Sequence, residues 1–151
     1  MQKITPFLWF DTQAEEAMNF YVSLFKNSMV LSVSPGPNGI ASSVNFELEG
    51  QEFIGFNAGP EFRFNESISF FVDCKDQAEV DYFWNALIAD GGEESMCGWL
   101  KDKYGLSWQI VPKQLRELMG DPDPEKSKRV RDAMLKMQKI IVADLQKAYN
   151  G

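Results

Sequence analysis

The tripeptide Gln-Ala-Glu occurs twice in this chain, 64 residues apart, and each copy stands at the same place in a longer pattern. A short apolar run of strand type precedes each copy, residues 4–10 in the first case and 68–74 in the second. Thr12 and Asp76 each stand three residues before a glutamate, which is the spacing of a capping box at a helix start. This repeat predicts two copies of one folding unit.

Each predicted cap is followed by a helix and then by further strands. Apolar residues recur at three- and four-residue steps after both caps: Ala14, Ala17, Met18, Tyr21, Leu24 and Phe25, then Val80, Phe83, Trp84, Leu87 and Ile88. Apolar and polar residues alternate over 44–48, and strand-like segments follow Gly50 and Gly105. Each half therefore predicts a strand, a helix and two or three strands. Two unrelated α+β stretches that share common helix caps are the alternative interpretation.

The last part of the chain has a different pattern. Asp123 and Pro124 are typical of the N-cap and first position of a helix. One apolar stripe then continues to the C-terminus: Val130, Met134, Met137, Ile141, Leu145 and Tyr149. The opposite face is basic, with Lys126, Lys128, Arg129, Arg131, Lys136 and Lys139. We expect a terminal helix that docks on its own domain or on a dimer mate, with a membrane or another partner as the alternative.

Charge and composition exclude several classes of function. The chain has 22 acidic and 15 basic residues, a net charge of −7, which argues against nucleic acid as a partner. It has no apolar run near the roughly 20 residues that span a bilayer, and its N-terminus lacks the pattern of a secretory signal. Histidine is absent, which excludes imidazole bases and histidine-ligated metals. Two cysteines without CxxC spacing suit a reducing compartment, so we expect a cytoplasmic protein.

Three segments resemble the PhnB-like proteins of the vicinal oxygen chelate superfamily. They are the opening Ile4-Thr5-Pro6-Phe7-Leu8-Trp9-Phe10-Asp11, the closing strand motif over residues 97–112, and Asp121-Pro122-Asp123-Pro124-Glu125-Lys126. The resemblance implies an α+β fold in which paired βαβββ modules form a curved mixed sheet around a cavity, the glyoxalase/bleomycin resistance fold. Residues 1–113 would form this domain, with modules at about 1–63 and 64–113, and residues 114–151 a helical extension. The resemblance also implies a homodimer.

The chemistry that the resemblance implies does not all fit these residues. Superfamily enzymes typically hold a divalent metal ion with His, Glu or Gln from the first and last strands of each module. The first strands here contain no such ligand, and the matching positions in the closing strands are Ile54 and Gln109. We therefore expect no metal and no cofactor. Many PhnB-like chains carry a methyltransferase label, but the Gly/Pro-rich segment 34–39 precedes a strand instead of opening a helix, so it lacks the form of a nucleotide-binding turn. It is either a lid over the cavity or a plain surface loop.

The candidate ligand-binding residues are three aromatic and three polar side chains: Trp9, Phe56, Trp99, Gln109, Glu52 and Asn57. Trp108 and Ser107 are further candidates beside them. Alternation along the last strand places Gln109 with Val111 on one face and Trp108 on the other, and we expect Gln109 to face the cavity. For Cys97 we expect a buried, inert thiol in preference to a nucleophile.

Three hypotheses about function follow. The first is binding of a small, partly apolar molecule without a metal ion. The second is a divalent-metal lyase or dioxygenase with an atypical ligand set drawn from Gln109, Glu52 and Asp73. The third is a dimeric interaction module whose cavity is filled by its own aromatic side chains. Whether the chain is an enzyme stays open among them.

Overall fold

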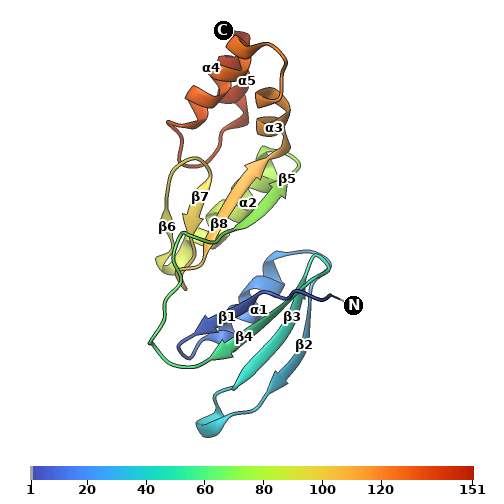
Figure 1. The fold of residues 1–151 in the computed structure, drawn as a ribbon, viewed down its shortest axis with the longest axis vertical. Coiled ribbons are helices and arrows are strands. Elements are labelled where there is room, and N and C mark those ends of the chain that lie inside the picture. The colour runs from blue at the N-terminus through green and yellow to red at the C-terminus, as the bar shows by residue number, and fades with distance from the viewer. Residues whose placement is uncertain (1) are drawn as a thin grey trace. The chain divides into compact units, whose positions relative to one another are not determined.

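The computed structural model describes residues 2–151, which divide after Phe64 into two units. Each unit contains one four-stranded mixed sheet with the same strand order, β1-β4-β3-β2 in the first and β5-β8-β7-β6 in the second (Figure 1). In both, the first strand of the unit pairs in parallel with the last. The predicted repeat of a strand, a helix and two or three strands is confirmed by this shared topology, with three strands after the helix in each unit. No helix within the described part of the chain is long and apolar enough to span a membrane.

The first unit packs one helix on its sheet. Its elements are β1 Phe7–Phe10, α1 Ala14–Leu24, β2 Met29–Ser34, a 3-10 turn Pro37–Gly39, β3 Ser43–Leu48 and β4 Gln51–Asn57. The predicted alternation over 44–48 is confirmed, because Val44, Phe46 and Leu48 are buried and the residues between them are less so. The buried residues of α1 are Ala14, Ala17, Met18 and Tyr21. Tyr21 packs its ring 6.3 Å from that of Phe46, so α1 covers this face of the sheet.

The first predicted capping box is wrong. Gln13, not Thr12, occupies the N-cap position of α1, and its side chain makes no cap hydrogen bond. The amide of Ala14 instead donates to Oδ1 of Asn57 at 2.9 Å, and Nδ2 of Asn57 donates to the carbonyl of Ala41 at 2.9 Å. An acceptor from the end of β4 therefore replaces the local one. β1 and β4 are parallel neighbours, so Asn57 ends its strand close to where α1 begins.

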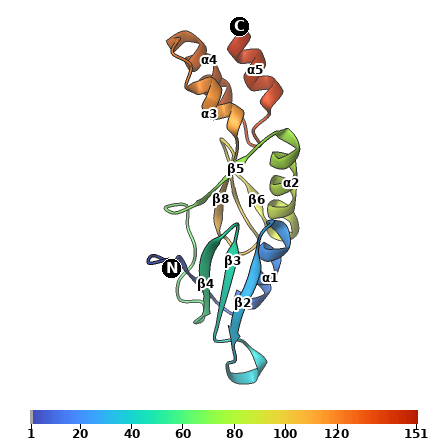
Figure 2. The ribbon, with the colours of Figure 1, turned by 90° about the vertical axis from the view of Figure 1, so that its right-hand side faces the viewer.

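The second unit repeats this plan with a conventional helix start. It contains β5 Phe70–Cys74, α2 Gln77–Ile88, a 3-10 turn Ala89–Gly91, β6 Glu93–Glu94, β7 Trp99–Lys101 and β8 Ser107–Pro112. Asp76 caps α2, and its Oδ1 accepts from the amide of Glu79 at 2.9 Å, as predicted. Figure 2 shows α2 lying along the sheet formed by β5 to β8.

A buried aspartate organises the turn between β7 and β8. Asp102 is only 2% exposed. Its Oδ1 accepts from the backbone amides of Tyr104 and Leu106 at 2.9 and 3.1 Å, and its Oδ2 accepts from Nε1 of Trp108 at 2.9 Å. Burial of this carboxylate is offset by three hydrogen bonds, which also fix the start of β8.

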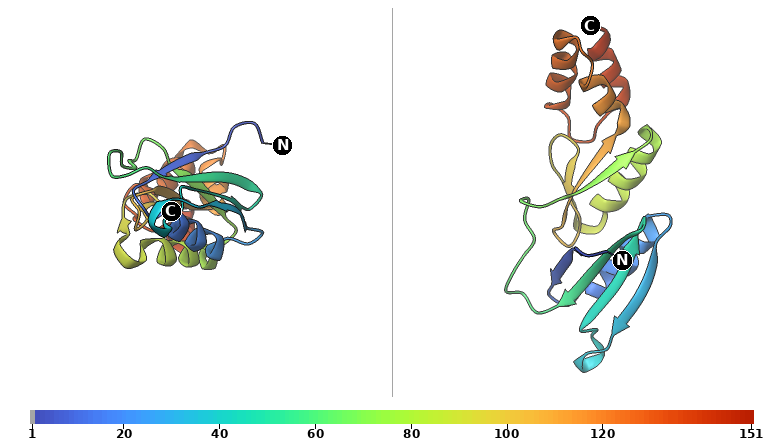
Figure 3. Two further views of the ribbon diagram at one scale, coloured as in Figure 1. Left: turned by 90° about the horizontal axis from the view of Figure 1, so that it is seen from below. Right: turned by 45° about the vertical axis from the view of Figure 1, so that its right-hand side comes forward.

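The C-terminal segment forms three helices: α3 Lys113–Met119, α4 Pro124–Met134 and α5 Val142–Asn150. They gather at the end of the second sheet, where β8 runs directly into α3 (Figure 3). The Asp123 cap is confirmed, because its side chain accepts from the amides of Glu125 and Lys126. The expectation of one terminal helix with a continuous stripe is wrong. Residues 135–141 separate α4 from α5, and Ile140, not Ile141, is fully buried.

The break in the predicted helix has a physical cause in the second sheet. The amides of Cys97 and Gly98 donate to the carbonyls of Met137 and Gln138 at 2.7 and 2.8 Å. These two carbonyls therefore accept from the residues just before β7, and not from amides further along a helix. The linker also brings Ile140 into a cluster with Val111, Leu115, Val130 and Leu145.

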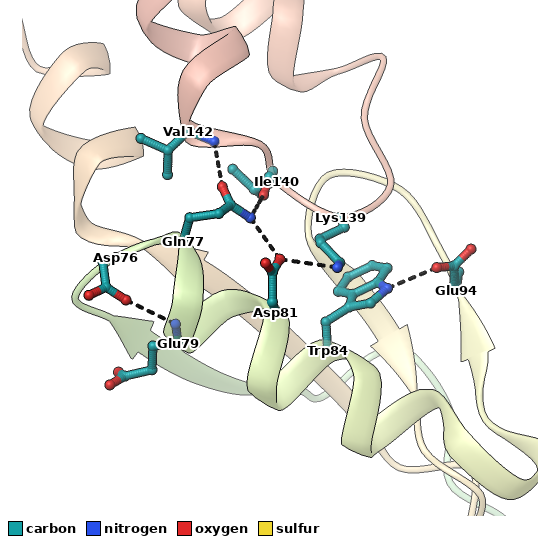
Figure 4. Close-up of polar contacts among 9 residues, drawn as sticks. All are labelled: Asp76, Gln77, Glu79, Asp81, Trp84, Glu94, Lys139, Ile140 and Val142. Atoms are coloured by element: carbon teal, nitrogen blue, oxygen red, sulfur yellow. Dashed lines mark hydrogen bonds and ion pairs between the residues drawn. The ribbon is translucent and has the colours of Figure 1, made fainter.

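Polar contacts on α2 hold the same linker from the other side (Figure 4). Gln77 accepts from the amide of Val142 at 2.7 Å and donates to the carbonyl of Ile140 at 3.0 Å. Asp81 accepts from Gln77 at 3.0 Å and pairs with Lys139 at 3.1 Å. These two bonds lower the pKa of Asp81, that from Gln77 contributing most. The linker is thus fixed to α2 as well as to the sheet.

Candidate ligand-binding site

A pocket of about 500 Å³ lies in the second unit, and one row of side chains across the sheet forms its floor. Gln109 of β8 stands opposite Phe71 of β5 on one side and opposite Trp99 of β7 on the other. Val111 and Cys97 extend this floor. The volume falls in the range of small-molecule sites, and the floor combines apolar surface with one amide, as such sites commonly do.

Gln109 faces the pocket as predicted. Trp108 and Ile110, its neighbours along β8, are 3% and 0% exposed and do not line the pocket. Nε2 of Gln109 donates to Oγ of Ser69 at 3.0 Å, which fixes the side chain. Within residues 2–151 nothing donates to its Oε1. The amide is therefore held in position with an acceptor atom left for a ligand.

The opposite wall of the pocket comes from the C-terminal helices. Leu115, Arg116 and Met119 belong to α3, Gly120 follows it, and Met134 ends α4. Arg116 donates from Nη2 to Oδ1 of Asp73 at 2.6 Å, and its guanidinium lies 5.5 Å from the ring centre of Phe71. Both groups of this ion pair are more than half exposed, so the pair positions Arg116 at the rim and adds little stability. None of these five residues was among the predicted ligand-binding candidates.

The two cysteines differ in environment. Cys74 is fully buried, and burial raises the pKa of its thiol to about 12, with smaller contributions from Glu79 and Asp73. Cys97 is half-buried at the pocket floor, which corrects the expectation of a buried thiol. It has a left-handed backbone, with φ of 60°. That conformation turns its amide towards the linker and leaves its side chain beside Trp99 and Gln109.

The other candidate residues lie in the first unit, where they fall into two groups. Trp9 and Phe56 pack together, with ring centres 5.6 Å apart, and Phe62 lies 4.9 Å from Trp9. The indole of Trp9 donates to the carbonyl of Gly59 at 2.9 Å. Asn57 is committed to the start of α1, and Glu52 is exposed on β4. Among the candidates, Trp9 thus contacts Phe56, Trp99 lies beside Gln109, and Asn57 caps the start of α1.

A smaller hollow of about 180 Å³ shares Trp99 with the pocket. It is lined by Ser107, by the ion pair of Lys101 with Glu66, and by Glu93 and Glu94 among others. Oγ of Ser107 is buried and lacks a hydrogen-bond partner within residues 2–151. Hydrogen bonding to Lys101 lowers the pKa of Glu66 and raises that of Lys101. This hollow is polar, in contrast to the larger pocket.

The donor atoms around the larger pocket do not form a metal-binding set. The side-chain ligand atoms in its lining are the thiol of Cys97, the amide oxygen of Gln109 and the soft thioethers of Met119 and Met134, and Arg116 adds a positive charge. Across the described residues no group of three or more Cys, Asp or Glu side chains is placed to share one metal ion. Asp73, a member of the atypical ligand set considered above, pairs with Arg116.

Comparison with known proteins agrees with this fold. The family model described as 3-demethylubiquinone-9 3-methyltransferase matches residues 2–111. A solved PhnB protein from Bacillus cereus is 37% identical, with a TM-score of 0.69, and the match covers 74% of this chain and 99% of that one. No curated protein sequence matches the chain significantly.

Two more distant structures show the fold alone. Protein PA1353 from Pseudomonas aeruginosa is 18% identical with a TM-score of 0.61, over 74% of this chain and 98% of its own. The fosfomycin resistance protein FosX from Listeria monocytogenes is 16% identical with a TM-score of 0.55, over 77% of this chain and 94% of its own. The α+β glyoxalase/bleomycin resistance fold predicted from the sequence is thereby confirmed. The chain belongs to the 3-demethylubiquinone-9 3-methyltransferase family of PhnB-like proteins.

Proposed function

We propose that this chain binds a small, partly apolar molecule in the pocket of its second unit, without a metal ion. The observation that carries the proposal is the row Phe71–Gln109–Trp99, in which two aromatic side chains flank one fixed amide. An apolar or aromatic ligand gains from contact with both rings. A hydroxyl or amine on the ligand would donate to Oε1 of Gln109.

The donor set of the pocket supports binding without a metal. A divalent ion needs several converging oxygen, nitrogen or thiolate ligands, and Arg116 opposes a further cation. The second hypothesis, an enzyme with an atypical metal site, loses support because Asp73 is engaged by Arg116. The third, an interaction module with a filled cavity, loses support because the pocket holds about 500 Å³.

The remaining parts of the proposal come from the resemblance. Residues 1–113 act as the vicinal oxygen chelate domain and residues 114–151 as its extension, in a cytoplasmic homodimer. The family description names a methyltransferase. We do not extend that activity to this chain, since the Gly/Pro-rich segment 34–39 ends in a 3-10 turn and leads into β3, away from any long helix.

Native mass spectrometry of the freshly purified protein, with elemental analysis, tests the proposal first. We expect a metal-free dimer that carries a small organic mass. Benzyl alcohol and toluene then serve as probes that differ in one hydroxyl, with binding followed by titration calorimetry and tryptophan fluorescence. We expect benzyl alcohol to bind more tightly, and this preference to disappear in Gln109→Leu.

Gln51→Leu provides the matched control, because Gln51 is an exposed glutamine on β4. It should retain the preference for benzyl alcohol. Stoichiometric metal that is lost in Gln109→Ala would overturn the proposal in favour of the metal enzyme. Absence of binding by either probe, in protein without an organic mass, would overturn it in favour of the interaction module.

A further inference from the structure

We propose that the C-terminal extension sets the size of the ligand, with Met119 and Met134 as the specificity-determining side chains. The inference rests on the proposed function, because it concerns the same pocket. It assigns to residues 114–151 a role in the site in addition to stabilising the fold.

Half of the residues that line the pocket lie outside the region that the family model matches. The family match ends at residue 111, and the Bacillus cereus protein is covered over 99% of its length by a match to 74% of this chain. Leu115, Arg116, Met119 and Met134 all follow residue 111. The matched region supplies the floor of the pocket, and the extension supplies the wall.

The extension is fixed in place by three sets of contacts. Val130, Ile140 and Leu145 are fully buried in one cluster with Val111 of β8. The amides of Cys97 and Gly98 bond to the linker between α4 and α5, and Gln77 holds that linker on α2. A wall anchored by a packed core and by backbone hydrogen bonds limits the pocket in a defined position.

Two methionines give the wall an adaptable apolar surface. Met119 and Met134 are partly buried, and both pack against this cluster while lining the pocket. Methionine is long and unbranched, so its thioether fills a gap and adapts to different apolar shapes. Arg116 is held by Asp73 and by the ring of Phe71 at the rim. The two methionines are therefore the side chains that limit how far the apolar part of a ligand extends.

The positions of Gln109 and the two methionines also predict how a ligand is oriented. A hydroxyl at Oε1 of Gln109 places the polar end of the ligand on the sheet. Its apolar end then points towards Met119 and Met134. The predicted ligand is a short apolar molecule with one hydrogen-bond donor at one end.

The experiment uses 4-alkylphenols of increasing chain length as probes, from phenol to 4-hexylphenol, with the full chain and titration calorimetry. We expect affinity to rise and then fall with length in the unaltered protein. In Met134→Ala and in Met119→Ala the preferred length should increase, with the ratio of long-chain to short-chain affinity changing at least tenfold. Met134→Trp should shift the preference towards phenol.

Leu135→Ala is the matched control, because Leu135 follows Met134 but is 54% exposed and does not line the pocket. Its length profile should equal that of the unaltered protein. Thermal unfolding checks that each variant is folded, and Met119→Leu and Met134→Leu replace any variant that is not, with a smaller change in profile expected. Unchanged profiles in the variants at both methionines would overturn this inference alone. Failure of the unaltered protein to bind any alkylphenol would overturn the proposed function as well.

Discussion

Replacement of Asp102 by asparagine tests how one buried carboxylate supports the strand that carries Gln109. Oδ1 of Asp102 receives two backbone amides and Oδ2 receives the indole of Trp108. An asparagine can keep its carbonyl oxygen towards the two amides. Its NH₂ group then meets the indole N–H of Trp108, and two donors face each other in a buried site.

The size of the effect follows from this geometry. A hydrogen bond to a charged group contributes about 1.5–3 kcal/mol, and an unpaired buried donor costs a similar amount. Asp102→Asn keeps two of its three bonds and loses the third, so we expect the free energy of unfolding to fall by about 2–3 kcal/mol. Since β8 begins five residues after Asp102, its pairing with β7 should also weaken.

Urea unfolding of four proteins measures the contribution: the unaltered chain, Asp102→Asn, Trp108→Phe and the double variant. Phenylalanine has no donor, so Asp102→Asn should cost about 2 kcal/mol less in the Trp108→Phe background. Asp132→Asn is the control, because its ion pair with Lys128 is exposed and an exposed pair adds little to stability. A loss below about 0.5 kcal/mol for Asp102→Asn, or equal losses in both backgrounds, would refute the reasoning.

Three further predictions concern the second unit. In urea unfolding, Gly98→Ala should destabilise the fold by about 1–3 kcal/mol more than Gly105→Ala. Both glycines have φ near +85°, but only at Gly98 would an added Cβ lie 3.0 Å from the carbonyl oxygen of Ile110 and 3.1 Å from the side chain of Ile140. Burial raises the pKa of Cys74 from 9.0 to about 12, so its contribution to stability is complete below pH 9 and is lost as the pH rises towards 12; unfolding from pH 8 to 11 should show this loss in the unaltered chain and not in Cys74→Ala. Gln77→Ala should speed hydrogen exchange at Val142, while Gln51→Ala should leave it unchanged.

The elements that the sequence predicted well are those determined by neighbours in the chain. The Asp76 and Asp123 caps depend on amides two or three residues away, and both are confirmed. α1 begins one residue later than predicted, and its cap was wrong because the acceptor on Asn57 lies 43 residues further along the chain. Local spacing contains no information on that partner. The choice of cap was settled by tertiary pairing of β1 with β4.

The C-terminal segment shows the same limit for periodicity. An apolar residue at every third or fourth position is consistent with one helix or with two helices that share a stripe. The linker at 135–141 is not helical, because the carbonyls of Met137 and Gln138 accept hydrogen bonds from the amides of Cys97 and Gly98, just before β7. Glycine was the one available signal, since Gly98 needs a left-handed backbone and a close approach to Ile140.

The candidate site shows the same contrast between residues that local sequence predicts and residues that tertiary packing brings in. Alternation along β8 predicted that Gln109 faces the cavity, and Trp99 was among the aromatic residues expected to line an apolar pocket in the curved sheet. Arg116, Met119 and Met134 were missed, because they reach the pocket only through packing of the extension on Val111. Phe71 was missed because its place beside Gln109 comes from the pairing of β5 with β8. The contact of Asn57 with the start of α1 was missed for a related reason, since an asparagine at the end of a strand has the same appearance whether it binds a ligand or caps a helix.

The two origins of the pocket lining determine how far a ligand found for one family member applies to another. The protein from Bacillus cereus shares 37% identity with this chain, but the shared region supplies only the sheet side of the pocket. Truncating Met119 or Met134 would leave every shared residue in place and still change which molecules fit. A ligand found for a relative without the extension would therefore report on the floor around Gln109 and not on the wall. The length of the apolar part has to be measured on this chain, because the residues that limit it lie beyond residue 111.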